Sequence, residues 1–139
     1  MRVMAIDYGD ARTGVAISDA AGTLTGFTTV VRSRKPALAA ADIAALVRSH
    51  GVERIVLGFP RNLDGTDSLR ALLYHGFADL LEDATGMDVV LWDEWRTTIE
   101  AHDILHAAGK RMIRHKKTVD AVAASLILEG YLTFLKRET

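Results

Sequence analysis

The order of the secondary-structure patterns constrains this fold more than any other feature of the sequence. Three strand-like runs open the chain and are joined by short turns: Arg2–Asp7, Thr13–Ser18 and Thr23–Val31. Short links of this kind favour an antiparallel meander. Two further strand-like runs, Arg54–Phe59 and Val89–Trp92, are separated by helical patterns and therefore need parallel crossovers. The sequence predicts an α/β fold with a mixed five-stranded sheet flanked by helices.

Four helical patterns accompany these strands. The first begins at Pro36 and ends before Gly51, and the last extends from about Thr118 to Phe134 after a basic loop. A capping box at Thr97 and Glu100 predicts the third. The second has Thr66 as its N-cap and Gly86 at its end, with a predicted core stripe of apolar and small residues: Leu69, Leu72, Leu73, Gly76, Phe77, Leu80 and Ala84.

The length of the chain, 139 residues, corresponds to a single domain covering residues 1–139. The absence of cysteine excludes disulfides, thiolate catalysis and cysteine-ligated zinc. Asp7 interrupts the apolar stretch near the N-terminus, so we expect no secretory signal, and no apolar run reaches the ~18 residues that span a bilayer. We therefore expect a soluble cytoplasmic protein with no membrane partner.

Three acidic residues stand where strands end or helices begin. Asp7 ends the first strand, Glu94 follows the fifth, and Asp120 lies in the predicted first turn of the last helix, on its apolar face. Ligands gather at the carboxyl ends of strands in folds of this class, so the three side chains can meet. Each also has a structural interpretation of its own: Asp7 as a turn residue, Glu94 as a solvated loop residue and Asp120 as a partner of the helix dipole.

Carboxylates that meet must be neutralised. A pair ~4 Å apart repels by about 4 kcal/mol at an effective dielectric constant near 20. Buried acids therefore become protonated or bind cations. Ligands that are all oxygen suit Mg²⁺ or Mn²⁺, and such a site is typical of two-metal hydrolysis of phosphodiesters.

The net charge of −1 argues against a nucleic-acid-binding protein, but the basic residues are clustered. One cluster contains Arg32, Arg34 and Lys35. From charge alone, either cluster is a solvated charge run, although both also fit a phosphate-binding surface. The larger cluster lies in a segment, Lys110 to Lys117, that we expect to be a loop closing on substrate phosphates, and its basic residues are Lys110, Arg111, Arg114, Lys116 and Lys117.

Four blocks of the sequence resemble the YqgF (RuvX) family of the ribonuclease H-like superfamily. They occur in the family's order and are distributed over nearly the whole chain, from residue 6 to residue 132: IDYGDARTGVAISD, IVLGFPRNLDGTDS, DEWRTTIEA and KKTVDAVAASLILEGYL. The resemblance implies a ribonuclease H-like fold and a metal-dependent nuclease, a hydrolase. The family is associated with maturation of the 5′ end of pre-16S ribosomal RNA and has also been described as a Holliday junction resolvase.

The resemblance also implies roles for individual residues. Asp7, Glu94 and Asp120 fall on the family's catalytic acids, which would hold two Mg²⁺ or Mn²⁺ ions, with Asp7 bridging them. For substrate binding, Arg12 and Asn62 fall on the family's Arg and Asn, and a basic position before the last acid falls on Lys116 or Lys117; Arg114 lies nearby. The sequence departs from the family's pattern at three positions: Arg61, Trp95 and Arg96.

We therefore expect a two-metal nuclease that acts on an RNA precursor or on branched DNA. A resolvase cuts two strands symmetrically, which favours a homodimer, whereas an RNA-processing enzyme need not dimerise. An inactive nucleic-acid-binding module of the same fold is a second alternative. A third is an ATPase related to actin and sugar kinases, because the run from Asp7 to Gly14 is similar to their first phosphate loop. Those proteins close two lobes over a nucleotide, and this chain supplies one.

Overall fold

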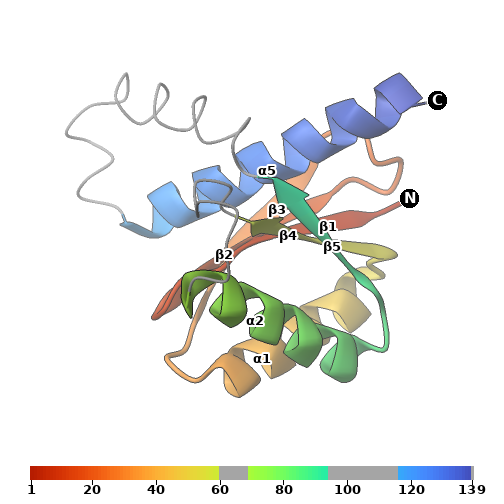
Figure 1. The fold of residues 1–139 in the computed structure, drawn as a ribbon. Helices are drawn as coiled ribbons and strands as arrows, with labels where there is room; N and C mark the ends of the chain where they lie inside the picture. Colours follow the sequence, from red (N-terminus) through yellow and green to blue (C-terminus); the bar gives the residue numbers. More distant parts are fainter. Residues whose placement is uncertain (60–68, 94–115, 139) are drawn as a thin grey trace.

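The structure is a computed structural model, and it describes residues 1–59, 69–93 and 116–138. Five strands form one sheet in the order β3-β2-β1-β4-β5 (Figure 1). β1 pairs with β2 and β2 with β3 in antiparallel fashion, whereas the β1–β4 and β4–β5 pairs are parallel. The predicted mixed sheet is confirmed, and its strands are β1 (Val3–Asp7), β2 (Arg12–Ser18), β3 (Thr25–Arg32), β4 (Arg54–Phe59) and β5 (Val89–Asp93).

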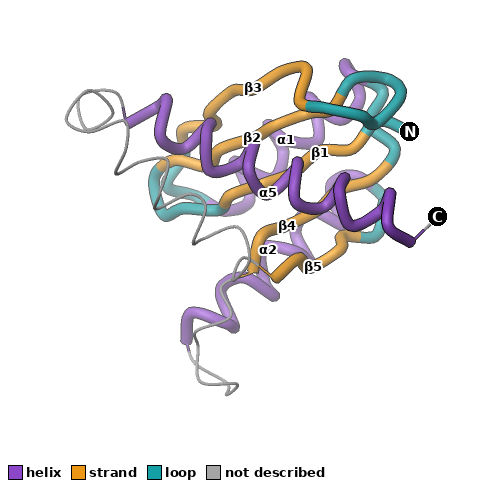
Figure 2. The backbone as a smooth tube through the Cα atoms, turned by 90° about the horizontal axis from the view of Figure 1, so that it is seen from above, coloured by secondary structure: helices purple, strands orange, loops and turns teal. Residues whose placement is uncertain are grey.

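Three described helices cover the two faces of the sheet. α1 (Pro36–His50) and α2 (Leu69–Thr85) lie on one face, and α5 (Lys116–Glu138) crosses the other. Figure 2 shows the strands in their sheet order beneath α5. None of the helices in the described part of the chain is long and apolar enough to span a membrane.

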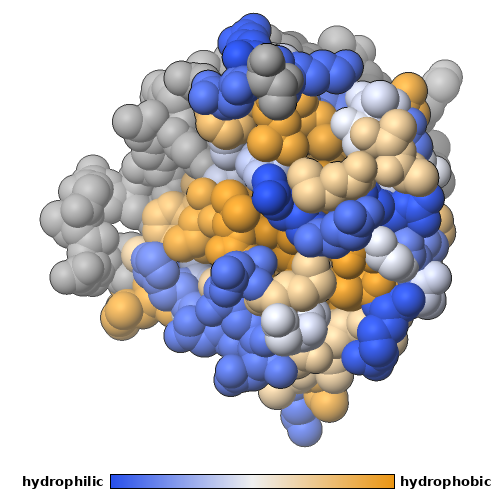
Figure 3. Space-filling model, turned by 90° about the vertical axis from the view of Figure 1, so that its right-hand side faces the viewer, coloured by the Kyte–Doolittle hydropathy of each residue, from blue (hydrophilic) through white to orange (hydrophobic). Residues whose placement is uncertain are grey.

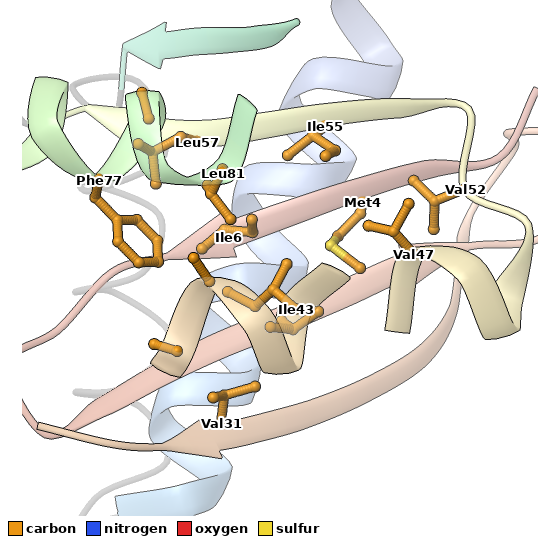
Figure 4. Packing of buried hydrophobic residues seen from close by; sticks show 14 of the residues in the cluster. Met4, Ile6, Val31, Ile43, Val47, Val52, Ile55, Leu57, Phe77 and Leu81 are labelled. Atoms are coloured by element: carbon orange, nitrogen blue, oxygen red, sulfur yellow. The ribbon is translucent and has the colours of Figure 1, made fainter. Parts of the chain in front are cut away.

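The face covered by α1 and α2 carries the larger core (Figure 4). Side chains alternate between the faces of a strand with a period of two. Met4 and Ile6 of β1 therefore point toward the same helices as Leu57 of β4, and all three are fully buried. The helices supply Ile43 and Phe77, among others, to the same cluster.

The face covered by α5 is built from the alternate strand positions. Val3 and Ala5 of β1 and Ala16 of β2 pack there against a buried stripe of α5 that includes Ala124 and Leu128. β5 is the outer strand on one side of the sheet, and its Leu91 is 39% exposed. The side of the molecule drawn in Figure 3 shows hydrophobic surface in its centre, bordered by hydrophilic side chains.

The predicted core stripe of α2 is confirmed at Phe77 and in part at Leu80, but it is wrong at its other positions. Leu69, Leu72 and Leu73 are 82%, 57% and 55% exposed, and Gly76 and Ala84 are exposed as well. The buried face is instead Ala71, Tyr74, Phe77, Ala78 and Leu81. The prediction omitted Tyr74, which is held inside by donating a hydrogen bond to the carbonyl oxygen of Tyr8 at 3.3 Å.

The predicted ends of the other helices are confirmed in part. Gly51 and Gly86 adopt left-handed conformations, with φ of 65° and 71°, after α1 and α2. α5 begins at Lys116, earlier than predicted, so Lys116 and Lys117 are helical and do not belong to a loop. Asp120 consequently lies in the second turn of α5, whose first turn contains no acidic residue. Thr66, Thr97 and Glu100 lie outside the described residues.

Candidate active site

Asp7 is placed by the register of the sheet. It is the last residue of β1, and it pairs with Gly14 of β2. Val3 and Ala5 face α5, so the side chain of Asp7, two residues further along the strand, lies on the same face. The candidate site therefore lies at the carboxyl end of β1, on the side of the sheet covered by α5.

Gly14 brings Asp120 to this position. A Cβ atom added to Gly14 would overlap the carbonyl oxygen of Asp120 and lie 2.8 Å from its carbonyl carbon. Only a residue without a side chain lets α5 rest this closely on β2. Because Gly14 pairs with Asp7 and contacts the backbone of Asp120, both acidic residues lie next to Gly14.

Arg12 completes the described part of the site. Its Nε lies 3.7 Å from Oδ2 of Asp120, and the two side chains are 34% and 27% exposed. This distance is longer than a hydrogen bond, so the contact is an attraction between charges. Oδ2 itself is buried from water. Arg12, predicted to bind substrate, therefore also faces one of the predicted catalytic acids.

The turn after Asp7 is anchored by aromatic packing. The ring of Tyr8 stacks on Phe77 with centroids 4.0 Å apart and planes 15° apart. Burial, and then the charge of Asp10, raise the pKa of Tyr8, so its phenol is neutral at neutral pH. A Cβ on Gly9 would overlap the carbonyl oxygen of Arg12, which makes this turn tight. The anchored turn holds Asp7 in place at the end of β1.

The other predicted site residues fall at the same end of the sheet or outside the described residues. Phe59 pairs with Asp93 in the parallel β4–β5 ladder, so β4 and β5 end side by side. Glu94 is the next residue after β5, but like Asn62 and Arg114 it lies outside the described part of the chain. Lys116 and Lys117 begin α5, and only their backbone is described.

Sequence reasoning missed Gly14 as a residue of the site. Glycine inside a strand often marks a close approach by another part of the backbone, and this was the available signal. The identity of the approaching segment required the structure, because Gly14 and Asp120 are far apart in the sequence.

The described residues fit a divalent cation. Their donors are the carboxylates of Asp7 and Asp120, which suit Mg²⁺ or Mn²⁺. Because Gly14 has no Cβ, the backbone of Asp120 can approach the strand position that pairs with Asp7. Within the described residues, no group of three acidic, histidine or cysteine side chains is placed to hold a metal ion.

Known sequences match this chain over nearly its whole length. The family model described as "RuvX: Holliday junction resolvase" matches residues 1–134. A protein of Syntrophus aciditrophicus (strain SB), named "Putative pre-16S rRNA nuclease", is 42% identical over 139 residues, which cover 99% of this chain and 92% of the relative.

Solved structures share the fold. The fowlpox virus resolvase in complex with Holliday junction DNA superimposes with a TM-score of 0.57 and 12% identity, covering 97% of this chain and 99% of that chain. This match confirms the predicted ribonuclease H-like fold. The ROK hexokinase of Thermus thermophilus matches with a TM-score of 0.52 and 27% identity, over 76% of this chain but 39% of the hexokinase. Most of this chain therefore superimposes on less than half of that hexokinase.

Proposed function

Because this chain belongs to the RuvX family, we propose that it is a metal-dependent nuclease that hydrolyses phosphodiester bonds in the precursor of 16S ribosomal RNA. The observation that carries the proposal is the close approach of α5 to β2 at Gly14, which brings Asp120 to Asp7 at one end of the sheet. Relatives with the name of the Syntrophus protein support the choice of substrate.

Asp7 and Asp120 would hold the metal, and Glu94 is the proposed third ligand. Glu94 follows β5 directly. Val90 and Trp92 are alternate residues of β5 that pack on the α5 face, and position 94 is the next in this series, which supports the proposal. Asp7 and Asp120 concentrate negative charge on this face, so a cation stabilises their arrangement. When bound, two Mg²⁺ or Mn²⁺ ions would supply a hydroxide nucleophile at neutral pH and offset charge on the leaving oxygen.

The basic residues would orient the substrate. Arg12 keeps one side of its guanidinium group near Asp120 and is 34% exposed, so it can also approach a phosphate. We propose phosphate contacts for Lys116 and Lys117, which begin the helix that carries Asp120, and for Arg114 and Asn62. Contacts from arginine and lysine to phosphate do not depend on the base sequence of the nucleic acid. They therefore suit a nuclease that recognises the shape of its substrate.

A second candidate function, resolution of DNA junctions, is favoured by the description of the family model, and the fold of a viral resolvase matches over 97% of this chain and 99% of that chain. The two candidate functions require different oligomeric states. Symmetric cutting of a junction needs a homodimer with twofold symmetry, whereas trimming of an RNA end does not.

The test compares three substrates under the same Mn²⁺ concentration: a fragment of the 16S precursor labelled at its 5′ end, a labelled four-way junction, and ATP. We expect cleavage of the RNA precursor, no ATP hydrolysis, and no cleavage by Asp7→Asn. Faster cutting of the junction, together with a dimeric mass in solution, would replace the RNA assignment with the resolvase assignment. ATP hydrolysis without nuclease activity would contradict both.

A further inference from the structure

A second set of basic residues lies beside the candidate site, on the outer strand β3. Arg32 of β3 pairs directly with Arg12 of β2, so both side chains lie on the face that α5 covers. Like charges that face each other across an antiparallel pair are unfavourable. Arg12 has Asp120 as its partner, whereas Arg32 forms no ion pair with a described residue, so an anion from outside the chain is the simpler explanation for Arg32.

The chain after Arg32 keeps two more basic residues close to the same point. The backbone N–H of Ser33 donates to the carbonyl oxygen of Ala11 at 3.2 Å, which joins this segment to the turn between β1 and β2. The hydroxyl of Ser33 accepts a hydrogen bond from the backbone N–H of Lys35 at 3.2 Å. Arg34 and Lys35 are therefore held beside the turn that follows Asp7.

Among the described residues, these charges have no acidic partner that neutralises them. Arg32, Arg34 and Lys35 are exposed, and none of the three forms an ion pair with another described residue. The first turn of α1, which follows Lys35, contains no acidic residue. Asp42 is the nearest acid along the sequence, and Asp10 lies in the turn to which Ser33 is joined; both are exposed, and neither forms an ion pair with the cluster among the described residues.

We propose that Arg32, Arg34 and Lys35 form a phosphate-binding track, called here the β3 track, with Arg12 at its inner end. The track would bind the backbone of a nucleic-acid strand on the β3 side of the site, beyond the phosphodiester that is cleaved. Its orientation relative to the cut rests on the proposed nuclease function, whereas binding itself does not. Side chains of this kind bind phosphates independently of base sequence.

The test measures how the affinity for RNA depends on salt. A variant with Arg32→Gln, Arg34→Gln and Lys35→Gln removes three positive charges at the track. Its matched control, Arg48→Gln, Lys136→Gln and Arg137→Gln, removes three exposed charges from the last turns of α1 and α5, at the opposite end of the sheet. The probe is a fluorescent single-stranded RNA of about 20 nucleotides, titrated in EDTA so that binding is measured without cleavage.

We expect the track variant to flatten the plot of log affinity against log salt by about two units, because each neutralised phosphate on a single strand contributes about 0.7. The control should keep the wild-type slope, and the melting temperatures of all three proteins should agree. An unchanged slope in the track variant, an equal loss in the control, or no RNA binding by the wild type at about 50 mM salt would overturn the proposal.

The outcome is separable from the nuclease assignment. If the wild type cleaves RNA while the track variant keeps the wild-type slope, the β3 track is wrong and the nuclease assignment stands. If the wild type binds RNA with the expected slope change but no Mn²⁺-dependent cleavage occurs, the track stands and the nuclease assignment is wrong.

Discussion

The two faces of the sheet use the same strands for different purposes. On the α1–α2 face, Ile6 and Val15 remain apolar and buried up to the end of the sheet where β1 stops. On the α5 face, the neighbouring positions are Asp7, Gly14 and Arg12. Because side chains alternate along a strand, one face can be packed for stability while the other carries charge one residue away. This difference predicts that mutations on the two faces separate stability from activity.

The largest effect is expected at Phe77 on the α1–α2 face. Its side chain is 1% exposed and stacks on Tyr8, so Phe77→Ala should lower the free energy of unfolding by about 3–5 kcal/mol. Urea unfolding measures this loss. Leu72→Ala is the control, because Leu72 is 57% exposed and should change stability by no more than about 0.5 kcal/mol. A large decrease in the free energy of unfolding of Leu72→Ala would indicate that the leucine stripe is the buried face of α2 after all.

A smaller loss of stability, with a larger loss of activity, is expected at Gly14. In Gly14→Ala the new methyl group overlaps the backbone of Asp120, and overpacking of this kind costs about 1–3 kcal/mol. The shift of α5 moves Asp120 away from Asp7, so cleavage by the folded protein should fall by more than the loss of stability explains.

Gly76→Ala is the matched control for Gly14→Ala. Apart from the nearby backbone of α2 itself, no atom of the described residues lies within 4 Å of a Cβ added at Gly76. Helical alanine is favoured over glycine by about 1 kcal/mol, so this variant should be more stable and fully active. If Gly14→Ala cleaves as fast as Gly76→Ala, close contact of α5 with β2 is not needed for activity.

Arg12→Gln should change stability little and metal binding more. Its ion pair with Asp120 is partly exposed, and such pairs contribute about 0.2–1 kcal/mol. Without this competing cation, Asp120 should bind Mn²⁺ more tightly, which calorimetry can measure. Arg32→Gln removes the same charge from the facing strand without touching the ion pair. If Arg12→Gln and Arg32→Gln increase the affinity for Mn²⁺ equally, the effect is due to net charge. If Arg12→Gln binds Mn²⁺ more weakly than the wild type, the account is contradicted.

The smallest effect concerns Asp19, a carboxylate at the opposite end of β2 from Arg12. It accepts hydrogen bonds from the side chain and backbone of Thr23, which lower its pKa. A lowered folded-state pKa contributes stability above the unfolded value of about 3.9, and this contribution is lost as the pH falls through the folded value. The difference in melting temperature between wild type and Asp19→Asn should therefore shrink as the pH falls below about 4. A difference that is constant with pH would show that the charge of Asp19 is not involved.

The strands and their pairing could be predicted from the sequence because turn length and apolar runs determine them locally. Arg54–Phe59 was predicted with its observed bounds, and Gly51 and Gly86 were predicted as helix ends. The face of α2 could not be predicted in this way. Several leucines compete with one tyrosine on that helix, and the hydrogen bond from Tyr74 to Tyr8 joins segments that are distant in the sequence.

In the candidate site, too, local features could be predicted from the sequence and contacts between distant segments could not. The position of Asp7 at the end of a strand could be predicted from the pattern of that strand alone. The contact between Asp120 and Gly14, and the ion pair with Arg12, depend on where a distant helix crosses the sheet. The sequence alone indicates a solvated charge run at Arg32, and the β2–β3 register places this residue opposite Arg12.

Thermal unfolding with increasing Mn²⁺ tests most directly the claim that the α5 face of the sheet end is a metal-dependent active site. Metal that binds only the folded protein should raise the stability of the wild type by about 2.7 kcal/mol at ~100 times the dissociation constant. Asp7→Asn should show no such rise and no cleavage, whereas Asp10→Asn, which alters an exposed acid of the adjacent turn, should behave as the wild type. Equal responses of the wild type and Asp7→Asn to the metal, whether both rise or neither does, would contradict the account.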